Sequence, residues 1–336
     1  MLTVTPNDPV VIPGIIGQKR LNISYFIFIY SLLHLPKHLE EIKGSILVAL
    51  GAASYGVLAT FVKLAHGQGY STAEITFSQF IIGFVTLGLL QLFQKKQPIT
   101  QGGNSVNTRL QLMLAGTSLG LTSTFYYLTV QYLPVSVCII LLMQSIWMGL
   151  LLECVLMRTW PTLRQIISTL MVLVGTMLAT NLIQTEVVFS GKGLMFGLLA
   201  AMSYTVSMYS SNKVAPQLAA ITRSMYLVLG GLLAIIIFWN TSLIDSFRIS
   251  VLWPWGGFLA LFGTIIPPLL FTRGMPMTGI ALGSILGSVE IPVSILCAHL
   301  ILHEKVIGIQ WLGVGLIITA VFALNVNFRR GKALTS

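Results

Sequence analysis

Charged residues are scarce in this chain. Asp, Glu, Lys and Arg make up 8% of its 336 residues, whereas about a quarter of the residues of a soluble domain are charged. So few charges cannot cover a water-facing surface, which excludes an ordinary soluble domain. The chain instead contains repeated apolar stretches of about 20 residues, each long enough to cross a bilayer as a helix. The sequence therefore predicts an all-α membrane protein surrounded by lipid.

Cysteine is also rare, and familiar catalytic motifs are missing. Cys138, Cys154 and Cys297 lie in apolar stretches without paired spacing, which predicts small buried side chains. The chain has no HExxH, no phosphate-binding loop and no Gly-x-Ser-x-Gly. His299 and His303 share a helical face, but a third fixed ligand for a metal is missing. We therefore expect no enzyme activity, no metal, no cofactor and no direct use of ATP.

Ten apolar stretches are long enough to span a membrane, and the net charge of +10 lies mostly between them. We place them at 44–64, 73–93, 109–130, 135–153, 162–182, 193–213, 221–239, 255–271, 278–302 and 309–327. The basic residues form no continuous face, so no nucleic-acid partner is expected. With the residues before 44 inside, only Lys63, Lys192, Arg248 and Lys305 of the 19 Lys and Arg fall outside. This bias predicts an inner-membrane protein with both termini in the cytoplasm.

Residues 1–43 do not fit this pattern. The apolar stretch 21–35 is short for a span, and no signal-peptide cleavage site follows it. The segment is either an interfacial helix or the product of a wrongly assigned start, and the sequence does not decide between them. At the other end, residues 329–336 form a basic cytoplasmic tail.

The two halves of the chain resemble each other. At an offset of 149 positions, the second half repeats five residues of the first: Gly44, Ala52, Ser54, Tyr55 and Val57 as Gly193, Ala201, Ser203, Tyr204 and Val206. The halves, 44–182 and 190–328, would each contain five spans, and an odd number makes them enter the membrane from opposite sides. Such inverted-topology repeats are a recurrent architecture of secondary transporters, whose solute site lies near the midplane.

Longer segments resemble the drug/metabolite transporter superfamily, specifically proteins with two EamA-type domains. The likeness covers about 42–327 and rests on "YLPVSVCIILLMQSIWMGLLLECVLMRTWPTLRQIISTLMVLVGTMLATN" and "MPMTGIALGSILGSVEIPVSILCAHLILHEKVIGIQWLGVGLIITAVFALN". The family often has an acid directly before a proline in the ninth span, where Ile291 here separates Glu290 from Pro292. It often has an arginine near the start of the second span, where Gln79 stands here. The resemblance implies a transporter of small solutes without naming one.

Glu290 is the most informative single residue, because an ionised carboxylate in the middle of a span is costly and usually faces the bundle interior or water. It either binds a cationic group or a proton, or it fixes helix packing. Pro292 removes a backbone donor beside it. Pro267 and Pro268, in the eighth span, either break a helix that lines a cavity or only kink it.

Aromatic and polar side chains lie near the centre of both halves. Tyr55 and Tyr204 are equivalent in the repeat, and with Tyr126, Tyr127, Gln144 and Trp147 they can form the wall of a cavity for an amphipathic solute. Each of them alone also fits a membrane interface or a helix contact. Gly279, Gly283 and Gly287 recur every four residues, which is typical of close helix packing in membranes.

These observations predict a permease or exporter with ten transmembrane helices in two five-helix inverted-topology repeats. It would move a small organic solute, such as an amino acid or a related metabolite, by alternating access at a central cavity, with protons as a candidate coupling ion. An alternative is a membrane-embedded enzyme acting on a lipid-soluble substrate. The sequence leaves open the substrate, the direction of transport and the oligomeric state, a monomer included.

Overall fold

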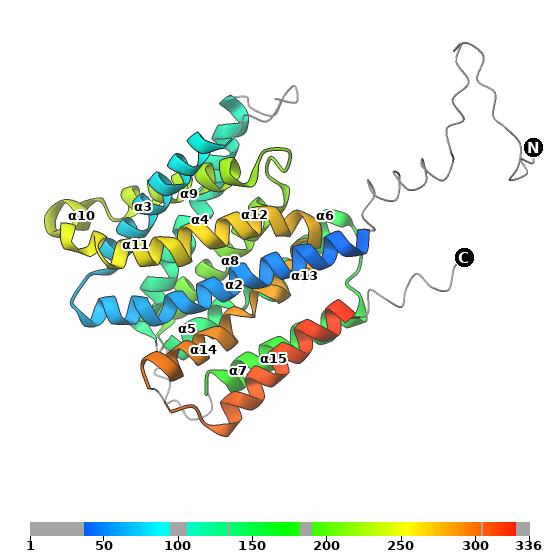
Figure 1. Cartoon of the computed structure of the whole chain (residues 1–336). Helices are drawn as coiled ribbons and strands as arrows, with labels where there is room; N and C mark the ends of the chain where they lie inside the picture. The colour runs from blue at the N-terminus through cyan, green and yellow to red at the C-terminus, as the bar shows by residue number, and fades with distance from the viewer. Residues whose placement is uncertain (1–36, 95–105, 134, 182–189, 304, 327–336) are drawn as a thin grey trace, which may run out of the picture. The chain divides into compact units, whose positions relative to one another are not determined.

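The regular structure of the described residues is helical throughout. The computed structural model describes residues 37–94, 106–133, 135–181, 190–303 and 305–326, and it contains no strand within these ranges (Figure 1). From Glu41 onward the chain forms one compact unit. Residues 1–36 and the expected basic tail, 329–336, lie outside the described ranges.

The first half of the chain contributes α2 to α7 and the second half α8 to α15 (Figure 1). The bounds in the first half are α2 Lys37–Gly67, α3 Thr72–Phe93, α4 Val106–Tyr132, α5 Val135–Leu142, α6 Ser145–Met157 and α7 Leu163–Ala179. Those in the second half are α8 Gly191–Lys213, α9 Ala220–Phe238, α10 Asn240–Ser246, the 3-10 turn η2 Ile249–Leu252, α11 Trp255–Ala260, the π turn η3 Leu261–Ile265, α12 Ile266–Thr278, α13 Ile280–Gly287, α14 Glu290–Ile301 and α15 Gly308–Val326.

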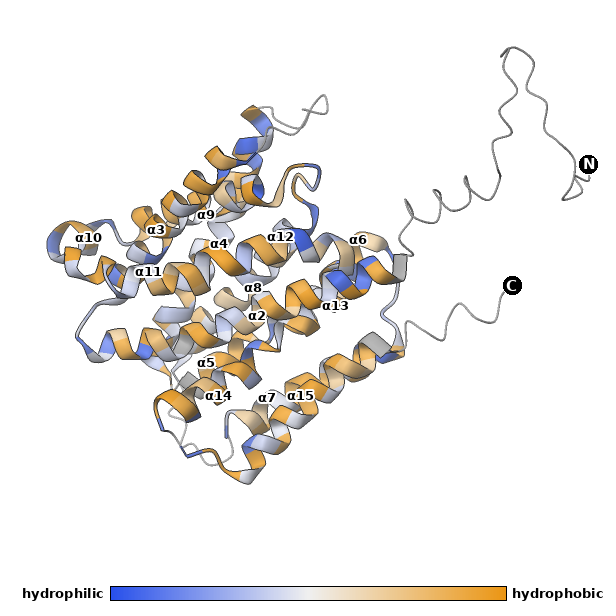
Figure 2. Cartoon of the chain, in the orientation of Figure 1, coloured by the Kyte–Doolittle hydropathy of each residue, from blue (hydrophilic) through white to orange (hydrophobic). Residues whose placement is uncertain are grey.

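Six helical stretches among the described residues are long and apolar enough to cross a membrane. They are Leu39–Gly67, Thr72–Phe93, Val137–Met157, Ala220–Phe238, Trp255–Thr278 and Ile280–Ile301, and two shorter apolar helices are Leu163–Ala179 and Gly308–Leu324. Hydrophobic residues run along these helices, while hydrophilic ones gather at helix ends and connections (Figure 2). The expected spans 109–130 and 193–213 fall in α4 and α8, where Ser, Thr, Tyr and Gln lower the hydropathy. The total of ten spans stays a prediction.

Two of the expected spans are divided in the middle. The stretch 135–153 lies in α5 and α6, and 278–302 in α13 and α14. Gln144 and Val289, which precede the second helix of each pair, have the same backbone angles, φ −59° and ψ −21°. Because Pro292 has no N–H to offer the Ser288 carbonyl, that carbonyl instead accepts from Ile291 N at 3.0 Å. The α-helical ladder is therefore interrupted immediately before Glu290.

The expected eighth span contains a π turn. Pro267 and Pro268 occupy the first positions of α12, directly after η3, and both are buried. Prolines there cannot donate to the carbonyls four residues earlier, which fall within the π turn. The irregular backbone thus precedes the two prolines, and the helical path continues from α11 into α12.

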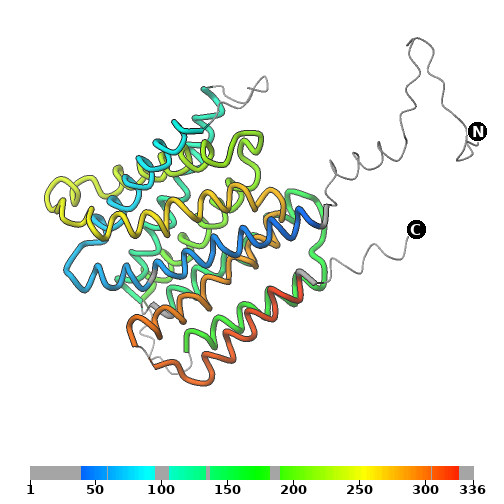
Figure 3. The backbone as a smooth tube through the Cα atoms, in the orientation of Figure 1, coloured from blue at the N-terminus to red at the C-terminus, as the bar shows by residue number. Residues whose placement is uncertain are grey.

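Glycines allow several helix pairs to approach closely. A Cβ on Gly116 of α4 would collide with the backbone of Leu227 in α9, and one on Gly313 of α15 would collide with the carbonyl of Gly175 in α7. The pair α7 and α15 lies side by side in Figures 1 and 3. Small residues at such contacts are the usual basis of helix association in membranes.

Candidate functional site

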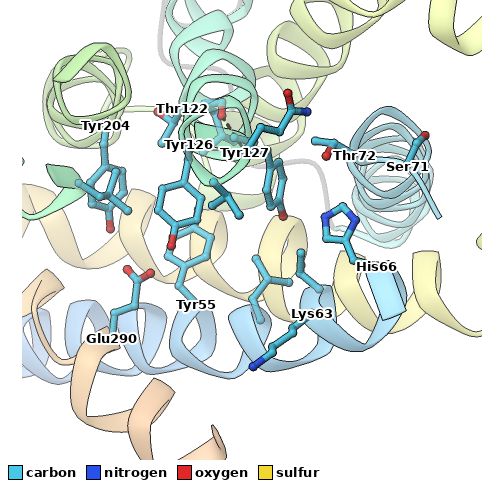
Figure 4. A pocket seen from close by; sticks show the side chains of 17 residues that line it. Tyr55, Lys63, His66, Ser71, Thr72, Thr122, Tyr126, Tyr127, Tyr204 and Glu290 are labelled. Atoms are coloured by element: carbon cyan, nitrogen blue, oxygen red, sulfur yellow. Dashed lines mark hydrogen bonds between the residues drawn. The ribbon is translucent and has the colours of Figure 1, made fainter. Parts of the chain in front are cut away.

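A cavity of about 610 Å³ lies among six helices (Figure 4). Most of its wall comes from α2 and α4, with single side chains from α5, α8 and α14 and two residues at the start of α3. The lining residues are Tyr55, Leu58, Val62, Lys63, His66, Ser71, Thr72, Leu119, Thr122, Ser123, Tyr126, Tyr127, Val130, Gln131, Leu142, Tyr204 and Glu290.

One face of α2 runs along the length of the cavity. Its lining residues Tyr55, Leu58, Val62 and His66 are spaced by three or four positions, which is the repeat of one helical face. The face begins at Tyr55 and ends near the connection to α3, where Ser71 and Thr72 join the wall. We call this the Ser71 end of the bundle, and the opposite end, where α2 carries Gly44, the Gly44 end.

Glu290 lies at the inner limit of the cavity, with three tyrosines around it (Figure 4). It is the first residue of α14, so the interruption of the helix places it there. A Cβ on Gly56 of α2 would collide with the Glu290 carbonyl, which shows how closely the two helices meet. The Glu290 carboxylate makes no hydrogen bond or ion pair with any residue in the described ranges. Within the described ranges, this carboxylate at the cavity wall is therefore not matched by a protein partner.

The tyrosines at this end come from α2, α4 and α8. The rings of Tyr55 and Tyr204 meet edge to face with centroids 6.5 Å apart, and Tyr55 also meets Phe271 at 5.8 Å. The Tyr204 side chain is only 5% exposed, and its hydroxyl has no hydrogen-bond partner among the described atoms. A buried hydroxyl without a partner is costly, so this one is well suited to bind a ligand.

The Ser71 end of the cavity is lined by basic and neutral polar side chains. His66 is held by its own turn, because its Nδ1 donates to the Tyr70 carbonyl at 3.0 Å. A carbonyl can only accept, so Nδ1 carries the proton in that bond. The His66 ring also lies edge to face with Tyr127, with centroids 6.4 Å apart. Lys63 lies one turn before His66 on α2 (Figure 4).

An ion pair fixes the α2–α3 connection beside the cavity. Ser71 and Glu74 form a capping box at the start of α3, and Glu74 is 1% exposed. Arg248 donates from Nε and Nη2 to the two Glu74 oxygens, at 2.8 and 2.9 Å. These hydrogen bonds raise the pKa of the Arg248 guanidinium above its ordinary value. The negative charge of Glu74 is thus already matched at this end.

The Gly44 end of the bundle is closely packed. A Cβ on Gly44 of α2 would collide with Met277 of α12, and one on Gly51 would collide with the Phe271 ring. The cavity lining on α2 starts only at Tyr55, further along the helix. The cavity therefore extends toward the Ser71 end, while contacts between α2 and α12 occupy the Gly44 end.

Arg223 strengthens the closure at the Gly44 end. Its side chain is 1% exposed, and among the described residues it donates to backbone carbonyls: Nη1 to Thr272 at 2.6 Å, Nε to Val214 at 3.0 Å, and Nη2 to Ser211 at 2.7 Å and Ser210 at 3.4 Å. Ser211 and Val214 belong to the end of α8, whose carbonyls lack helical partners and favour a cation. One side chain of α9 thus joins α8 to α12.

The structure brings together only some of the residues singled out from the sequence. Glu290, Tyr55, Tyr126 and Tyr204 line the cavity, and so does Tyr127. Gln144 and Trp147 are not part of this lining. Trp147 Nε1 donates to Gln144 Oε1 at 2.9 Å, and Gln144 Nε2 donates to the Ile140 carbonyl at 3.0 Å.

The helix-breaking prolines also lie outside the lining. Pro267, Pro268 and Pro292 shape the backbone near the site, but none of them contributes to the cavity wall.

Sequence reasoning missed the polar residues at the Ser71 end. His66, Ser71, Thr72 and Gln131 lie at or near helix ends, where polar residues normally mark the membrane surface. A signal was present in the capping box of Ser71 and Glu74, which fixes the start of α3 and therefore the position of its first residues.

Comparison with known proteins identifies the fold and the family. A solved structure described as "Crystal structure of protein" matches over 88% of this chain and 99% of its own, with a TM-score of 0.61 and 14% identity; at that identity the likeness shows the fold alone. No curated protein matches the chain. The model of the EamA-like transporter family matches twice, at residues 42–181 and 191–326. Since these two matches cover most of the sequence, the chain belongs to the EamA-like transporter family.

Proposed function

We propose that the protein is a secondary transporter that carries a small organic solute, such as an amino acid or a related metabolite, through the cavity by alternating access. Membership of the EamA-like transporter family supports a membrane transporter of the drug/metabolite kind. The observation that carries the proposal is the Glu290 carboxylate, which lines the cavity and has no hydrogen-bond or ion-pair partner among the residues that the structure describes. Acids within a membrane are expensive, and they commonly mark a solute or proton pathway.

The proposed architecture is ten transmembrane helices in two five-helix inverted repeats, 44–182 and 190–328. Residues 1–43 would form an extension and 329–336 a basic tail, with both termini in the cytoplasm of an inner-membrane protein. Two observations support the repeat: the family model matches each half separately, and α5–α6 and α13–α14 are interrupted by residues with the same backbone angles. Halves of this kind can rock against each other around a fixed central site.

The arrangement of the two ends supports alternating access. In this conformation the cavity extends to Ser71 and Thr72, whereas contacts such as that between Gly44 and Met277 occupy the opposite end. A transporter of this kind would exchange the two ends, closing around Ser71 while α2 and α12 separate near Gly44. Glu290, between the two ends, would remain with the solute in both states.

Glu290 would bind either a cationic group of the solute or a coupling proton. Tyr55, Tyr126 and Tyr204 would surround the bound group with rings and hydroxyls, which suit an organic cation. Gln144 and Trp147 were included in the expected site, and we now place them beside it, because they lie outside the lining. Pro292 would act indirectly, by keeping the helix interrupted before Glu290.

The test is solute counterflow into proteoliposomes. Proteoliposomes that contain the wild-type protein are preloaded with one unlabelled amino acid or related metabolite at a time. The uptake of the same solute in labelled form is then followed with and without a pH gradient. We expect saturable counterflow of at least one solute, and loss of most of it in Glu290→Gln, which keeps the size of the side chain and removes its charge. Asp245→Asn is the matched control, since Asp245 is an exposed acid on α10.

Two results would contradict this proposal. Uptake indifferent both to the pH gradient and to the counter-solute would exclude a coupled secondary transporter. Equal counterflow by wild type and Glu290→Gln would remove Glu290 from the mechanism and leave it a packing role.

A further inference from the structure

The helix α13, which opens the interrupted span before Glu290, begins without a side-chain cap of its own. Its N-cap residue is Gly279, whose φ of +84° turns the chain between α12 and α13. The first N–H groups of a helix have no partner within that helix. Here the N–H of Ala281 donates to Glu153 Oε2 at 2.5 Å. Glu153 thus supplies, from α6, the carboxylate that caps α13, and its negative charge suits a helix N-terminus.

Two glycines allow α6 and α13 to come this close. A Cβ on Gly279 would lie 3.3 Å from a carboxylate oxygen of Glu153, and one on Gly149 would collide with the Ser284 hydroxyl. Gly149 and Glu153 are four residues apart and therefore share one face of α6. Glu153 meets the start of α13 and Gly149 meets its middle, so the two helices pack side by side along this face.

This contact joins the two halves of the chain at the Gly44 end. The helix α6 belongs to the first half and α13 to the second, and a Cβ on Gly44 would lie 3.1 Å from Thr278, directly before the turn. The equivalent pair at the other end is α5 and α14, and both line the cavity, through Leu142 and Glu290. The pair α6 and α13 is thus in contact where the bundle is closed, whereas α5 and α14 both face the open space.

The residue of α14 that corresponds to Glu153 cannot form such a cap. Residues 145 positions apart correspond in the two interrupted spans. The residues that precede α6 and α14 share their backbone angles, and Arg158 and His303 have φ of +52° and +53°. At this offset Glu153 corresponds to Ala298, whose methyl group cannot accept a hydrogen bond. The carboxylate that fastens α6 to α13 therefore has no counterpart at that position of α14.

Resting on the alternating access proposed above, we infer that Glu153 is a positioning residue for transport, which holds α13 against α6 and favours the conformation whose cavity is open at the Ser71 end. When the Gly44 end opens, α6 and α13 separate and the Ala281 N–H loses its acceptor. Ala298 offers no equivalent bond in the opposite conformation, so the bias acts on one side only. Loss of one hydrogen bond to a charged group shifts the ratio of two conformations by about tenfold.

Cysteine labelling measures this bias without any solute. Ser284, which is 1% exposed and packs against Gly149, is replaced by Cys in the full chain, whose own three cysteines are replaced by Ala. In nanodiscs, a membrane-impermeant maleimide reaches this position when α6 and α13 separate. We expect Glu153→Ala to speed the labelling by about tenfold. Glu153→Gln should speed it less, because its amide oxygen can still accept from Ala281. Glu41→Ala, which removes an acid near the start of α2 at the same end, should not change it.

A disulfide tests whether the contact must open during transport. A Cβ on Gly149 would lie 3.0 Å from the Ser284 Cβ, slightly closer than the roughly 3.5–4.5 Å found in disulfides. Gly149→Cys combined with Ser284→Cys can therefore be joined by oxidation. The joined protein should keep its solute affinity, because the cavity opens at the other end, but it should lose counterflow, and reduction should restore it. Ser284→Cys alone, oxidised in the same way, is the control.

The outcomes separate this inference from the function on which it rests. If labelling in Glu153→Ala is as slow as with Glu153 intact, the inference is overturned, and a lower melting temperature would then show that Glu153 only stabilises the fold. Equal counterflow by the oxidised and the reduced pair would also overturn it, while the proposed transport function would stand. Absence of counterflow in the unmodified protein would instead contradict the proposed function, and the labelling would still decide whether Glu153 holds this contact.

Discussion

Tyr55 and Tyr204, which occupy the same position in the two halves of the chain, meet edge to face with ring centroids 6.5 Å apart. Each lies about midway along its half's first described helix, α2 or α8, and both line the cavity beside Glu290. The contact brings equivalent points of the two halves to one place, as a pseudo-symmetric site requires. The inner end of the cavity thus lies where the two halves meet.

The substitution Tyr204→Phe distinguishes a role of this hydroxyl in solute binding from a role in folding. Its buried hydroxyl has no hydrogen-bond partner among the described residues, so Tyr204→Phe removes no protein hydrogen bond. We expect the melting temperature to stay equal to that of the wild type or to rise slightly, because a buried unpaired polar group is lost. Solute affinity should fall by about tenfold, since the ring remains but the hydroxyl that meets the solute is gone.

The measurement for Tyr204 is thermal unfolding together with the Kd of the solute identified by counterflow. Tyr209→Phe is the matched control, because Tyr209 lies on the same helix outside the lining. A lower melting temperature with unchanged affinity would show that the hydroxyl is structural.

Gly283 tests the packing of the interrupted helix. The sequence predicts close packing at Gly279, Gly283 and Gly287, and a Cβ on Gly283 would collide with the Met275 sulfur. Gly279 has a different role, since its φ of +84° makes the turn between α12 and α13. We expect Gly283→Leu to lower the free energy of unfolding by about 1–3 kcal/mol, because extra atoms in a filled site force neighbours to move.

Thermal unfolding in detergent and the yield of folded protein measure the effect at Gly283. Gly315→Leu in α15 is the control, since open space surrounds that glycine, and it should be tolerated. Unchanged yield and melting temperature in Gly283→Leu would refute the packing role.

Much of the fold could be read from the sequence, because the low charge and the apolar stretches allow only a helical membrane protein. The equivalence of Tyr55 and Tyr204 also came from sequence, through the offset of 149. The cavity wall was harder to predict, because the rotation of each helix depends on its neighbours. Gln144 and Trp147 share an apolar stretch with Leu142, yet only Leu142 reaches the cavity.

Arg223 shows a second limit of sequence reasoning. Its place near the start of α9 counts it among the basic residues of a cytoplasmic segment, but the structure buries it and gives it carbonyl partners. Composition could not show this, because the acceptors are backbone atoms of α8 and α12, which every residue type possesses. Such a contact becomes visible only once the helices are packed.

The same contact leads to the last prediction, which concerns how the Gly44 end opens. Arg223→Gln leaves buried carbonyls of Ser211 and Thr272 without their charged donor, and we expect the free energy of unfolding to fall by about 3 kcal/mol. Arg223→Lys should lose nearly as much, because a single ammonium cannot reproduce the planar guanidinium that reaches four carbonyls. Arg273→Gln, at an exposed position on α12, should leave stability unchanged.

Weaker hydrogen bonds from residue 223 should also let the Gly44 end open more often, because Arg223 joins α8 to α12 there. Ser45, 7% exposed on α2, reports this opening when it is replaced by Cys in a protein whose own three cysteines are replaced by Ala. We expect Arg223→Lys to speed the labelling of Ser45→Cys by a membrane-impermeant maleimide by several-fold, and a solute that locks the cavity to slow it again. Suppose instead that Arg223→Lys lowers the melting temperature and yet leaves the labelling rate of Ser45→Cys unchanged. That result would show that Arg223 stabilises the fold but has no part in the opening of this end.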